Sequence, residues 1–325
     1  MKPLSIVAYY DGRLGHEKQT RAILKALAAL TATHIVHKKV PVSPAQFCKN
    51  WTAYILSSLW SPRVENFSAP VDLIIGSGAH THIPMLLEKK TREKLPGARV
   101  RIVTSMSPDL FLRRKFDLLC IPMHDEPPLL DNVFVTLGPP SPLVSERRHA
   151  PDRGLILVGG VDRKSHRWDT HQVIEQIQTI IQINPAMHWT ASSSPRTPAD
   201  TCNELEDLAS SIKQLDFFSS NDTPAGWVEK QYGMSGTVWV TADSISMIYE
   251  ALTAGCSVGV LPVTWLHHDS KFQKSLNILH GKKMIVDYNQ WRAGAPMPAP
   301  STEPFNEAER CAREILKRWW PDRLQ

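Results

Sequence analysis

Residues 238–255 read Val-Trp-Val-Thr-Ala-Asp-Ser-Ile-Ser-Met-Ile-Tyr-Glu-Ala-Leu-Thr-Ala-Gly and combine a β-branched, aromatic run with a helical pattern. Residues 238–240 favour a buried strand. Asp243 is expected to cap the helix that follows, and Gly255 to end it. A separate apolar stripe, able to pack on a sheet, is formed by Ile245, Ile248 and Leu252. The segment therefore predicts a strand–turn–helix unit of an α/β protein.

Polar side chains occupy another face of the same expected helix. Asp243, Ser246 and Glu250 follow one another at i, i+3 and i+7. Free N–H groups at a helix N-terminus attract phosphate, and a carboxylate further along can accept hydrogen bonds from ribose hydroxyls. Two interpretations stay open: a site for a phosphorylated, hydroxyl-rich ligand, or an ordinary crossover with capping and solvated side chains.

Length and composition limit the alternatives. A chain of 325 residues predicts two domains, and 42% hydrophobic with 21% charged residues is ordinary globular composition. No transmembrane helix or signal peptide is expected. Five scattered cysteines without CxxC spacing favour a reducing cytoplasm over a disulfide framework or zinc site. A net charge of +5 suits anionic substrates or lipid surfaces, and is too weak to indicate nucleic acid.

Strand-like and helix-like segments alternate along the chain, which predicts parallel sheets with helices on both faces. The stretch 138–151 is rich in proline and charge, so residues 141–153 are taken as a linker. We therefore expect one domain over 1–140 and a second over 154–325. The last helix, 306–319, is a candidate to pack back on the first domain.

In parallel α/β sheets, ligands bind beyond the carboxyl ends of the strands, so the loops there are the candidate sites. The first loop contains Asp11, Gly12, Gly15 and His16. Its glycines would let the backbone approach a ligand, and Asp11 and His16 offer an acid/base pair. The alternative is a plain turn capped by Asp11. Neither a Walker nor a dinucleotide-binding fingerprint is present.

A second glycine loop, 76–82, contains Gly78 and two histidines, His80 and His82. Metal binding would need a further ligand nearby, and none is evident, so no metal is expected. His82 is interpreted as a polar contact for an acceptor or as part of a plain loop. Asp109 follows another strand and could serve as a general base or as a helix cap.

Two loops of the second half suit phosphate. Gly159 and Gly160 form a turn followed by basic residues, and Ser193 and Arg196 lie in a hydroxyl-rich loop. Solvated charge and a Ser/Pro-rich connector are the competing explanations. The sequence has no GxSxG elbow, HExxH or GxGxxG motif, which disfavours hydrolase-triad, zincin and simple dehydrogenase functions.

These loops, in this order, resemble the mitochondrial-fission "elongated mitochondria" family, whose bacterial members are assigned as glycosyltransferases of the GT-B class. The segment 11–19 is similar to the family's opening Asp-Gly-Arg/Lys-Pro-Gly-His-x-x-Gln, with Leu14 where proline is usual. The other matching segments are 75–82, 116–125, 132–138, 158–160 with 167–169, 193–198, 240–247 with Glu250, and 306–310. These segments run in order and are distributed over nearly the whole length of the chain.

The resemblance implies a GT-B-like α/β fold, with two Rossmann-like domains whose parallel sheets face each other across a cleft. It implies a metal-independent glycosyltransferase without a cofactor, using a nucleotide-sugar donor and a glycan or glycolipid acceptor such as a lipopolysaccharide core. The donor would bind Gly159, Gly160, Ser193, Arg196, Asp243, Ser244, Ser246 and Glu250. The acceptor would bind Gly12, Gly15, Gly78 and His82.

Within this assignment, Arg196 would stabilise the charge of the leaving nucleotide. One of Asp11, His16 or Asp109 would accept the acceptor's proton, and His16 ranks first because imidazole titrates near working pH. A cytoplasmic protein is expected, with a peripheral position on the inner membrane face through residues 51–60 and 113–115. The aromatic residues of 51–60 could equally be core. A non-catalytic adaptor with this fold and a nucleotide-sugar epimerase are the alternatives.

Overall fold

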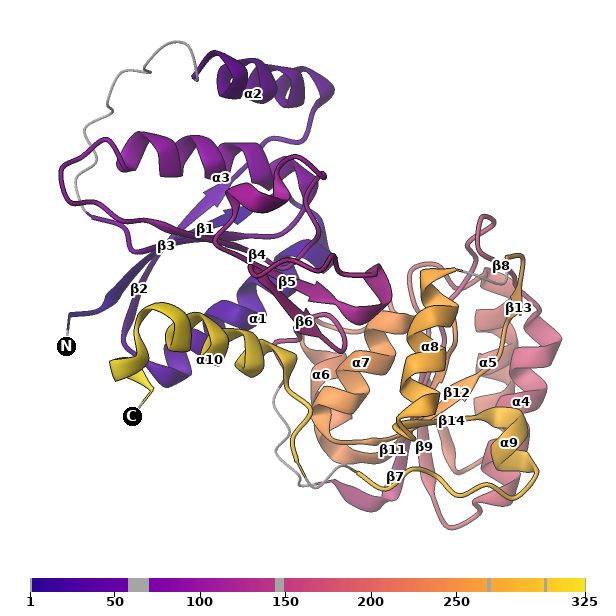
Figure 1. Ribbon diagram of the computed structural model, residues 1–325. Helices are drawn as coiled ribbons and strands as arrows, with labels where there is room; N and C mark the ends of the chain where they lie inside the picture. The colour runs from indigo at the N-terminus through magenta and orange to yellow at the C-terminus, as the bar shows by residue number, and fades with distance from the viewer. Residues whose placement is uncertain (1, 58–69, 144–148, 268–269, 301–302, 325) are drawn as a thin grey trace. The chain divides into compact units, whose positions relative to one another are not determined.

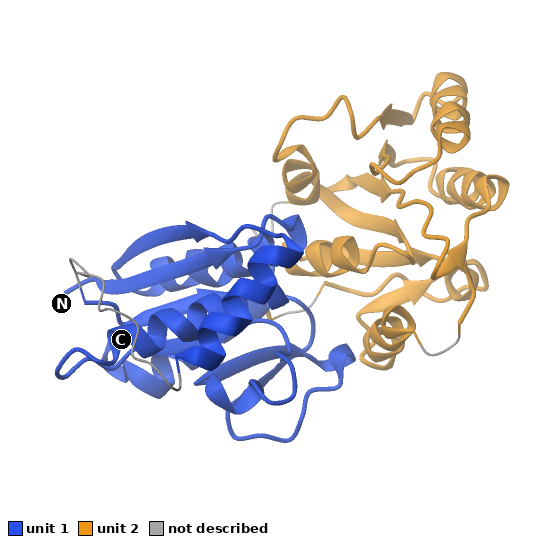
Figure 2. Cartoon of the chain, turned by 90° about the horizontal axis from the view of Figure 1, so that it is seen from above, with its two compact units in different colours: residues 1–142, 306–325 blue, residues 143–305 orange. Residues whose placement is uncertain are grey.

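The computed structural model describes residues 2–57, 70–143, 149–267, 270–300 and 303–324. The chain divides into two compact units (Figure 2). Unit 1 comprises residues 1–142 and 306–325, and unit 2 comprises residues 143–305. Each unit contains a sheet whose strands are all parallel, as the sequence predicts (Figure 1).

The sheet of unit 1 has the strand order β2-β1-β3-β4-β5-β6. Its strands are β1 (Leu4–Tyr10), β2 (Thr33–Lys39), β3 (Leu73–Gly76), β4 (Arg101–Thr104), β5 (Leu118–Pro122) and β6 (Val133–Thr136). Its helices are α1 (Leu14–Leu30), α2 (Pro44–Leu56), α3 (Ala79–Arg92) and α10 (Glu307–Trp319), with short 3₁₀ turns η1 (Arg113–Lys115), η2 (Met123–Asp125) and η3 (Pro321–Arg323). The strand order reverses between β1 and β3, which creates a switch point at their carboxyl ends.

The sheet of unit 2 has the order β10-β9-β7-β11-β12-β14. Its strands are β7 (Ala150–Leu157), β9 (His188–Ser192), β10 (Leu215–Phe218), β11 (Ser235–Thr241), β12 (Ser257–Leu261) and β14 (Ile285–Asp287). Its helices are α4 (Thr170–Ile183), α5 (Ala199–Ser211), α6 (Trp227–Met234), α7 (Ile245–Ala254), α8 (Lys271–Gly281) and α9 (Tyr288–Arg292). Numbered within the unit, this order is 3-2-1-4-5-6, the dinucleotide-binding arrangement, with its switch point between β7 and β11.

A two-stranded antiparallel pair, β8 (His166–Arg167) with β13 (Thr264–Trp265), is an addition to the sheet of unit 2. Neither strand is expected from the sequence, because two residues are too few to show an alternating pattern. The pair joins the segment after β7 to the segment after β12. It therefore helps to fix the loops at the carboxyl edge of the sheet.

The C-terminal helix α10 belongs to unit 1, whose core it completes (Figure 2). Its residues Cys311, Ala312, Ile315 and Leu316 are fully buried in the same cluster as Ile23 and Leu27 of α1. The predicted division therefore differs from the structure at two places. Residues 306–325 belong to unit 1, the position for which the sequence made the last helix a candidate, and β7 begins at Ala150, inside the stretch expected to be a linker.

The apolar patterns of the central segment are confirmed in α7. Ile245, Ile248 and Leu252 are all buried, and Gly255 ends the helix with φ +85°. The expected cap is wrong, because Ser244 precedes the helix and no side chain caps it. Asp243 lies one residue earlier, so only Ser246 and Glu250 share the helix face that the sequence assigned to three polar groups.

Candidate functional site

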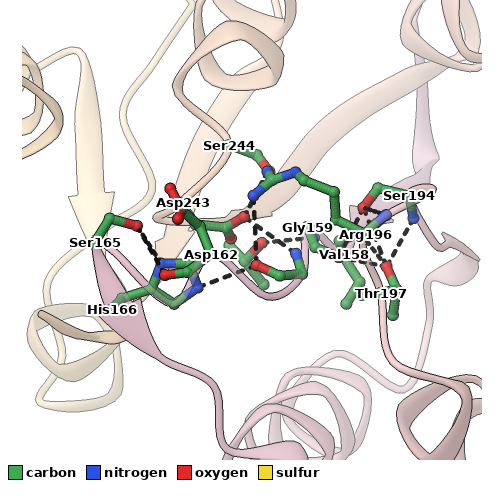
Figure 3. A network of polar contacts seen from close by, with 12 residues as sticks. Val158, Gly159, Asp162, Ser165, His166, Ser194, Arg196, Thr197, Asp243 and Ser244 are labelled. Carbon is green, nitrogen blue, oxygen red and sulfur yellow. Dashed lines mark hydrogen bonds and ion pairs between the residues drawn. The ribbon is translucent and has the colours of Figure 1, made fainter.

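The switch point of unit 2 brings three loops together, following β7, β9 and β11 (Figure 3). The Gly159 N–H donates to Thr241 Oγ1 at 2.7 Å, and the Gly160 N–H donates to Asp243 Oδ2 at 3.1 Å. A Cβ atom on Gly160 would lie 2.0 Å from the Arg196 carbonyl oxygen, so this close approach of two loops requires glycine. The glycine turn is thus a packed junction between strands.

Arg196 and Asp243 form the charged pair of this junction (Figure 3). Arg196 Nη2 donates to Asp243 Oδ2 at 2.8 Å and lies 3.4 Å from Ser244 Oγ. The Asp243 side chain is 1% exposed, whereas that of Arg196 is 45% exposed. Asp243 fails to cap α7 because it binds a guanidinium and the Gly160 N–H instead, and charge-assisted hydrogen bonds are stronger than neutral ones.

The N-terminus of α7 opens next to this pair. Within the described residues, the backbone N–H groups of Ile245 and Ser246 have no acceptor. Ser246 is exposed. With Arg196 half exposed beside Ser244, the junction presents a cation and free helix N–H groups, the combination that binds phosphate in proteins.

Glu250 lies on the second turn of α7 and is 9% exposed. Burial raises the pKa of Tyr232, and the Glu250 carboxylate adds to this effect, which places it near the phenol. Glu250 is therefore a largely buried group on the inner side of the helix.

Ser193 is also buried, and its Oγ accepts the Ser220 N–H at 2.9 Å. Its hydroxyl hydrogen remains a donor.

Sequence reasoning misses several residues that support this junction. Ser194 Oγ donates to the Gly159 carbonyl at 2.8 Å, and Thr197 Oγ1 also donates to that carbonyl. The buried His166 places Nε2 3.0 Å from the Gly160 carbonyl and Nδ1 2.8 Å from Ser165 Oγ (Figure 3). Nε2 must carry the hydrogen in order to bond that carbonyl. A single histidine on a two-residue strand has no sequence signal that could have found it.

The switch point of unit 1 holds a carboxylate–imidazole pair. His16 Nδ1 lies 2.8 Å from Asp11 Oδ2. The Asp11 side chain is fully buried and that of His16 is 19% exposed. Because the carboxylate accepts the hydrogen of Nδ1, the Nε2 atom of His16 is left as a base. Asp11 is thus placed to orient His16. Asp11 Oδ1 also accepts the Arg13 N–H at 3.1 Å, so Asp11 caps the turn as the alternative interpretation expects, although Arg13 is the N-cap residue of α1.

Gly78 makes this pairing possible. Its φ is +103°, and a Cβ atom there would lie 2.3 Å from Asp11 Oδ2 and 2.4 Å from His16 Nδ1. Gly12 also has a positive φ, of +78°, and Gly15, in the first turn of α1, has open space around its Cα. The two predicted glycine loops therefore meet at one site.

A buried hydroxyl chain lies beside the pair, and the sequence gives no indication of it. Thr20 Oγ1 donates to Ser77 Oγ at 3.0 Å, and Ser77 is hydrogen-bonded to Ser105. These residues come from α1 and from the segments after β3 and β4, so they tie the loops together.

Among the described residues, neither His82 nor Asp109 forms a hydrogen bond with the Asp11–His16 pair. His82 is 3% exposed, lies 3.3 Å from Thr104 Oγ1 and packs against Phe116. Burial lowers the pKa of His82 to about 4, and the neighbouring His16 adds to this effect. His82 is therefore neutral near pH 7, and its contacts with Thr104 and Phe116 hold the start of α3 against the neighbouring strands. Asp109 is exposed on the segment after β4, and within the described chain its carboxylate accepts no hydrogen bond.

No group of His, Cys, Asp or Glu side chains suited to hold a metal ion occurs among the residues that the structure describes. In the same part of the chain, no helix has both the length and the apolar character to cross a bilayer.

Two doubly wound parallel sheets, each with a polar cluster at its switch point, define a two-domain α/β protein of the GT-B-like class. Solved structures with this fold include a candidate UDP-N-acetylglucosamine 2-epimerase from Listeria monocytogenes, at 12% identity, 98% coverage of both chains and a TM-score of 0.52. The glycotransferase of kitacinnamycin is similar, at 12% identity, 100% coverage of both chains and a TM-score of 0.52. At such identities the likeness shows the fold alone.

The family is shown by a model described as mitochondrial fission ELM1, which matches residues 14–319. The chain belongs to this family, as its motifs predict. No curated protein matches the chain.

Proposed function

We propose that the protein is a metal-independent glycosyltransferase that moves a sugar from a nucleotide-sugar donor to a cell-envelope glycan or glycolipid, such as a lipopolysaccharide core. The observation that carries this proposal is the junction in unit 2. There, Arg196, the Gly159–Gly160 turn and the free N–H groups of α7 converge at the switch point of a dinucleotide-binding strand order.

The donor's phosphates would bind Arg196 and the first turn of α7, with Ser193 and Ser244 as hydroxyl donors. Arg196 would neutralise the charge that develops on the leaving nucleotide, which a metal ion does in other enzymes. Glu250 would accept from the ribose. Glu250 lies about 7 Å along the axis of α7 from the first residue of the helix. The ribose would therefore have to lie about 7 Å further along the helix than the phosphates.

The acceptor would bind at the switch point of unit 1, near Gly12, Gly15 and Gly78. His16 Nε2 would take the proton of the attacking hydroxyl, and Asp11 would stabilise the imidazolium that forms. Asp109 is the alternative base, because its carboxylate is exposed on the same edge of the sheet. His82 would act indirectly, through the position of this loop. The lipid-linked acceptor implies a cytoplasmic protein at the inner face of a membrane.

The donor assignment is tested by Ser246→Glu. A carboxylate in the first turn of a helix stabilises it by about 0.3–1 kcal/mol, and the same charge repels a phosphate at that position. We therefore expect the variant to be as stable as the wild type or slightly more so, while losing nucleotide binding in calorimetric titrations with UDP, GDP, ADP and CMP and their sugars. Gln46→Glu in the first turn of α2 is the matched control and should bind normally.

An epimerase is the second candidate, because one structure of this fold carries that assignment. The two functions differ in their products. An epimerase changes the donor sugar in the absence of any acceptor, whereas a transferase releases nucleotide only when it transfers or hydrolyses the sugar. A purified protein that binds no nucleotide at all would contradict both and favour the adaptor.

A further inference from the structure

A hollow of about 380 Å³ on unit 1 lies between α2, α3 and η1. Its lining includes four lysines, Lys89, Lys90, Lys94 and Lys115. Tyr54 and Leu86 provide an apolar part of the wall. The hollow lined by these four lysines is called the lysine hollow below.

The location follows from the direction of the elements. Helix α3 starts directly after β3 and ends before β4, so its last turn lies beside the amino ends of the strands. Lys115 lies in η1, just before β5 begins at Leu118. The lysine hollow therefore opens at the amino edge of the sheet, whereas His16 lies at the carboxyl edge.

The lining has four lysines and one carboxylate, that of Glu93, so positive charge is in excess in this hollow. Lys89 is paired with Asp117, and its Nζ lies 3.7 Å from Glu93 Oε1. Lys90 donates to the backbone carbonyl and the hydroxyl of Ser57, and among the described residues no carboxylate pairs with it. In the part of the chain that the structure describes, Lys115 has no ion pair either. An anion would therefore be attracted into the hollow.

Exposed aliphatic side chains lie at the same edge. Helix α2 buries none of its residues, and Ile55 and Leu56 in its last turn are 59% and 52% exposed. They follow Tyr54, which lines the hollow. Apolar side chains beside clustered lysines are the pattern of a segment that lies in the interface of an anionic membrane.

We propose that the amino edge of unit 1 docks on an anionic lipid bilayer, with a lipid phosphate in the lysine hollow and Ile55 and Leu56 in the interfacial layer. Free phosphate would satisfy the lysines alone and leave the aliphatic side chains exposed, so the bilayer is the better fit. This inference rests on the proposed function in one respect, because a lipid-linked acceptor is the reason for the protein to lie at a membrane.

This orientation has a consequence for the acceptor. Strand β1 has seven residues and spans about 20 Å, so with the strands along the bilayer normal the switch point would lie about that far from the bilayer. The accepting sugar must therefore be separated from its lipid anchor by several other sugars. An extended glycolipid meets this requirement, and a lipid monophosphate sugar does not.

The test is co-sedimentation of the full chain with vesicles of phosphatidylcholine alone or with added phosphatidylglycerol. The variant Lys90→Glu/Lys115→Glu should bind the anionic vesicles about 30-fold more weakly, from about 1 kcal/mol for each lysine and 1.4 kcal/mol for each tenfold change. Lys213→Glu/Lys282→Glu in unit 2 is the matched control, because both variants lower the net charge from +5 to +1. The control should lose far less binding.

A second measurement uses the unmodified protein, in case the variant folds poorly. Anionic vesicles should protect Lys90 and Lys115, but not Lys213, from acetylation. Binding that ignores lipid charge, or equal losses in the two variants, would overturn the proposal. Protection by pyrophosphate without vesicle binding would overturn the lipid as the source of the phosphate. Nucleotide titrations of the same variants report separately on the donor site of unit 2.

Discussion

The Arg196–Asp243 pair gives the sharpest prediction, because its two members differ so strongly in burial. Arg196 Nη2 and Asp243 Oδ2 are 2.8 Å apart, with side-chain exposures of 45% and 1%. Asp243 Oδ1 is buried and has no hydrogen-bond partner in the described structure. Removing the arginine therefore leaves a buried, poorly compensated carboxylate, whereas removing the aspartate leaves a guanidinium that water can reach.

The expected costs follow from this asymmetry. Arg196→Met should lower the free energy of unfolding by about 3 kcal/mol, the cost of leaving a buried charge without its partner. Asp243→Asn keeps an acceptor for the Gly160 N–H and should cost about 1.5 kcal/mol, the value of one hydrogen bond to a charged group. At about 2–4 °C for each kcal/mol, the melting temperatures should fall by about 6–12 °C and 3–6 °C.

Thermal and urea unfolding of both variants and of the double variant provide the assay. The double variant should be about as stable as Asp243→Asn alone, because the uncompensated carboxylate is then absent. Arg163→Met, which removes an exposed arginine near the same turn, is the control and should change stability by at most about 0.5 kcal/mol. Equal costs for the two single variants, or additive costs in the double variant, would refute the reasoning.

Nucleotide binding should also distinguish the two single variants. Arg196→Met removes a cation from the proposed phosphate site, so donor affinity should be lost. Asp243→Asn frees Arg196 from its carboxylate, so donor affinity should be kept or increased. A loss of affinity in both variants would show that the aspartate itself contacts the donor.

Three further predictions concern the other residues of the two sites. Burial lowers the pKa of His82 to about 4, so below about pH 6.5 the unfolded chain binds a proton at this histidine that the folded chain does not bind. The free energy of unfolding should therefore fall by about 3 kcal/mol as the pH drops from about 6.5 to 4. His82→Asn should remove this part of the pH dependence, measured by urea unfolding at a series of pH values. His16→Gln should lower kcat of sugar transfer by about 100-fold or more with little change in KM, whereas the exposed His34→Gln should behave as wild type. An unchanged kcat in His16→Gln would point to Asp109 as the base. Glu250→Gln keeps the shape of the side chain and should weaken donor binding by about tenfold, while the melting temperature shifts by only a few degrees. Glu175→Gln, on the exposed face of α4, is the control and should change neither donor affinity nor the melting temperature. Retained donor affinity of Glu250→Gln in calorimetry would exclude the ribose contact.

The sequence by itself determined the elements whose signals are local. The run 238–240 became part of β11, and the stripe Ile245, Ile248 and Leu252 became the buried face of α7. Gly255 ended the helix because an αL position accepts glycine most readily. Burial repeats along a strand or a helix with a fixed period, so these features can be deduced from residues a few positions apart. The ordered glycine loops also pointed to the family and to the GT-B-like fold.

Only the tertiary structure decided which polar groups pair. Asp243 has an N-cap sequence, yet it binds Arg196 and the Gly160 N–H, which are 47 and 83 residues away in the chain. Thr20, Ser77 and Ser105 come from three separate segments, and α10 returns from the far end of the sequence to fill the core of unit 1. The order of strands in a sheet determines which of these distant residues become neighbours, and the free energy of burying a charge determines which of them pair. A pattern of a few consecutive residues indicates neither the strand order nor the pairing.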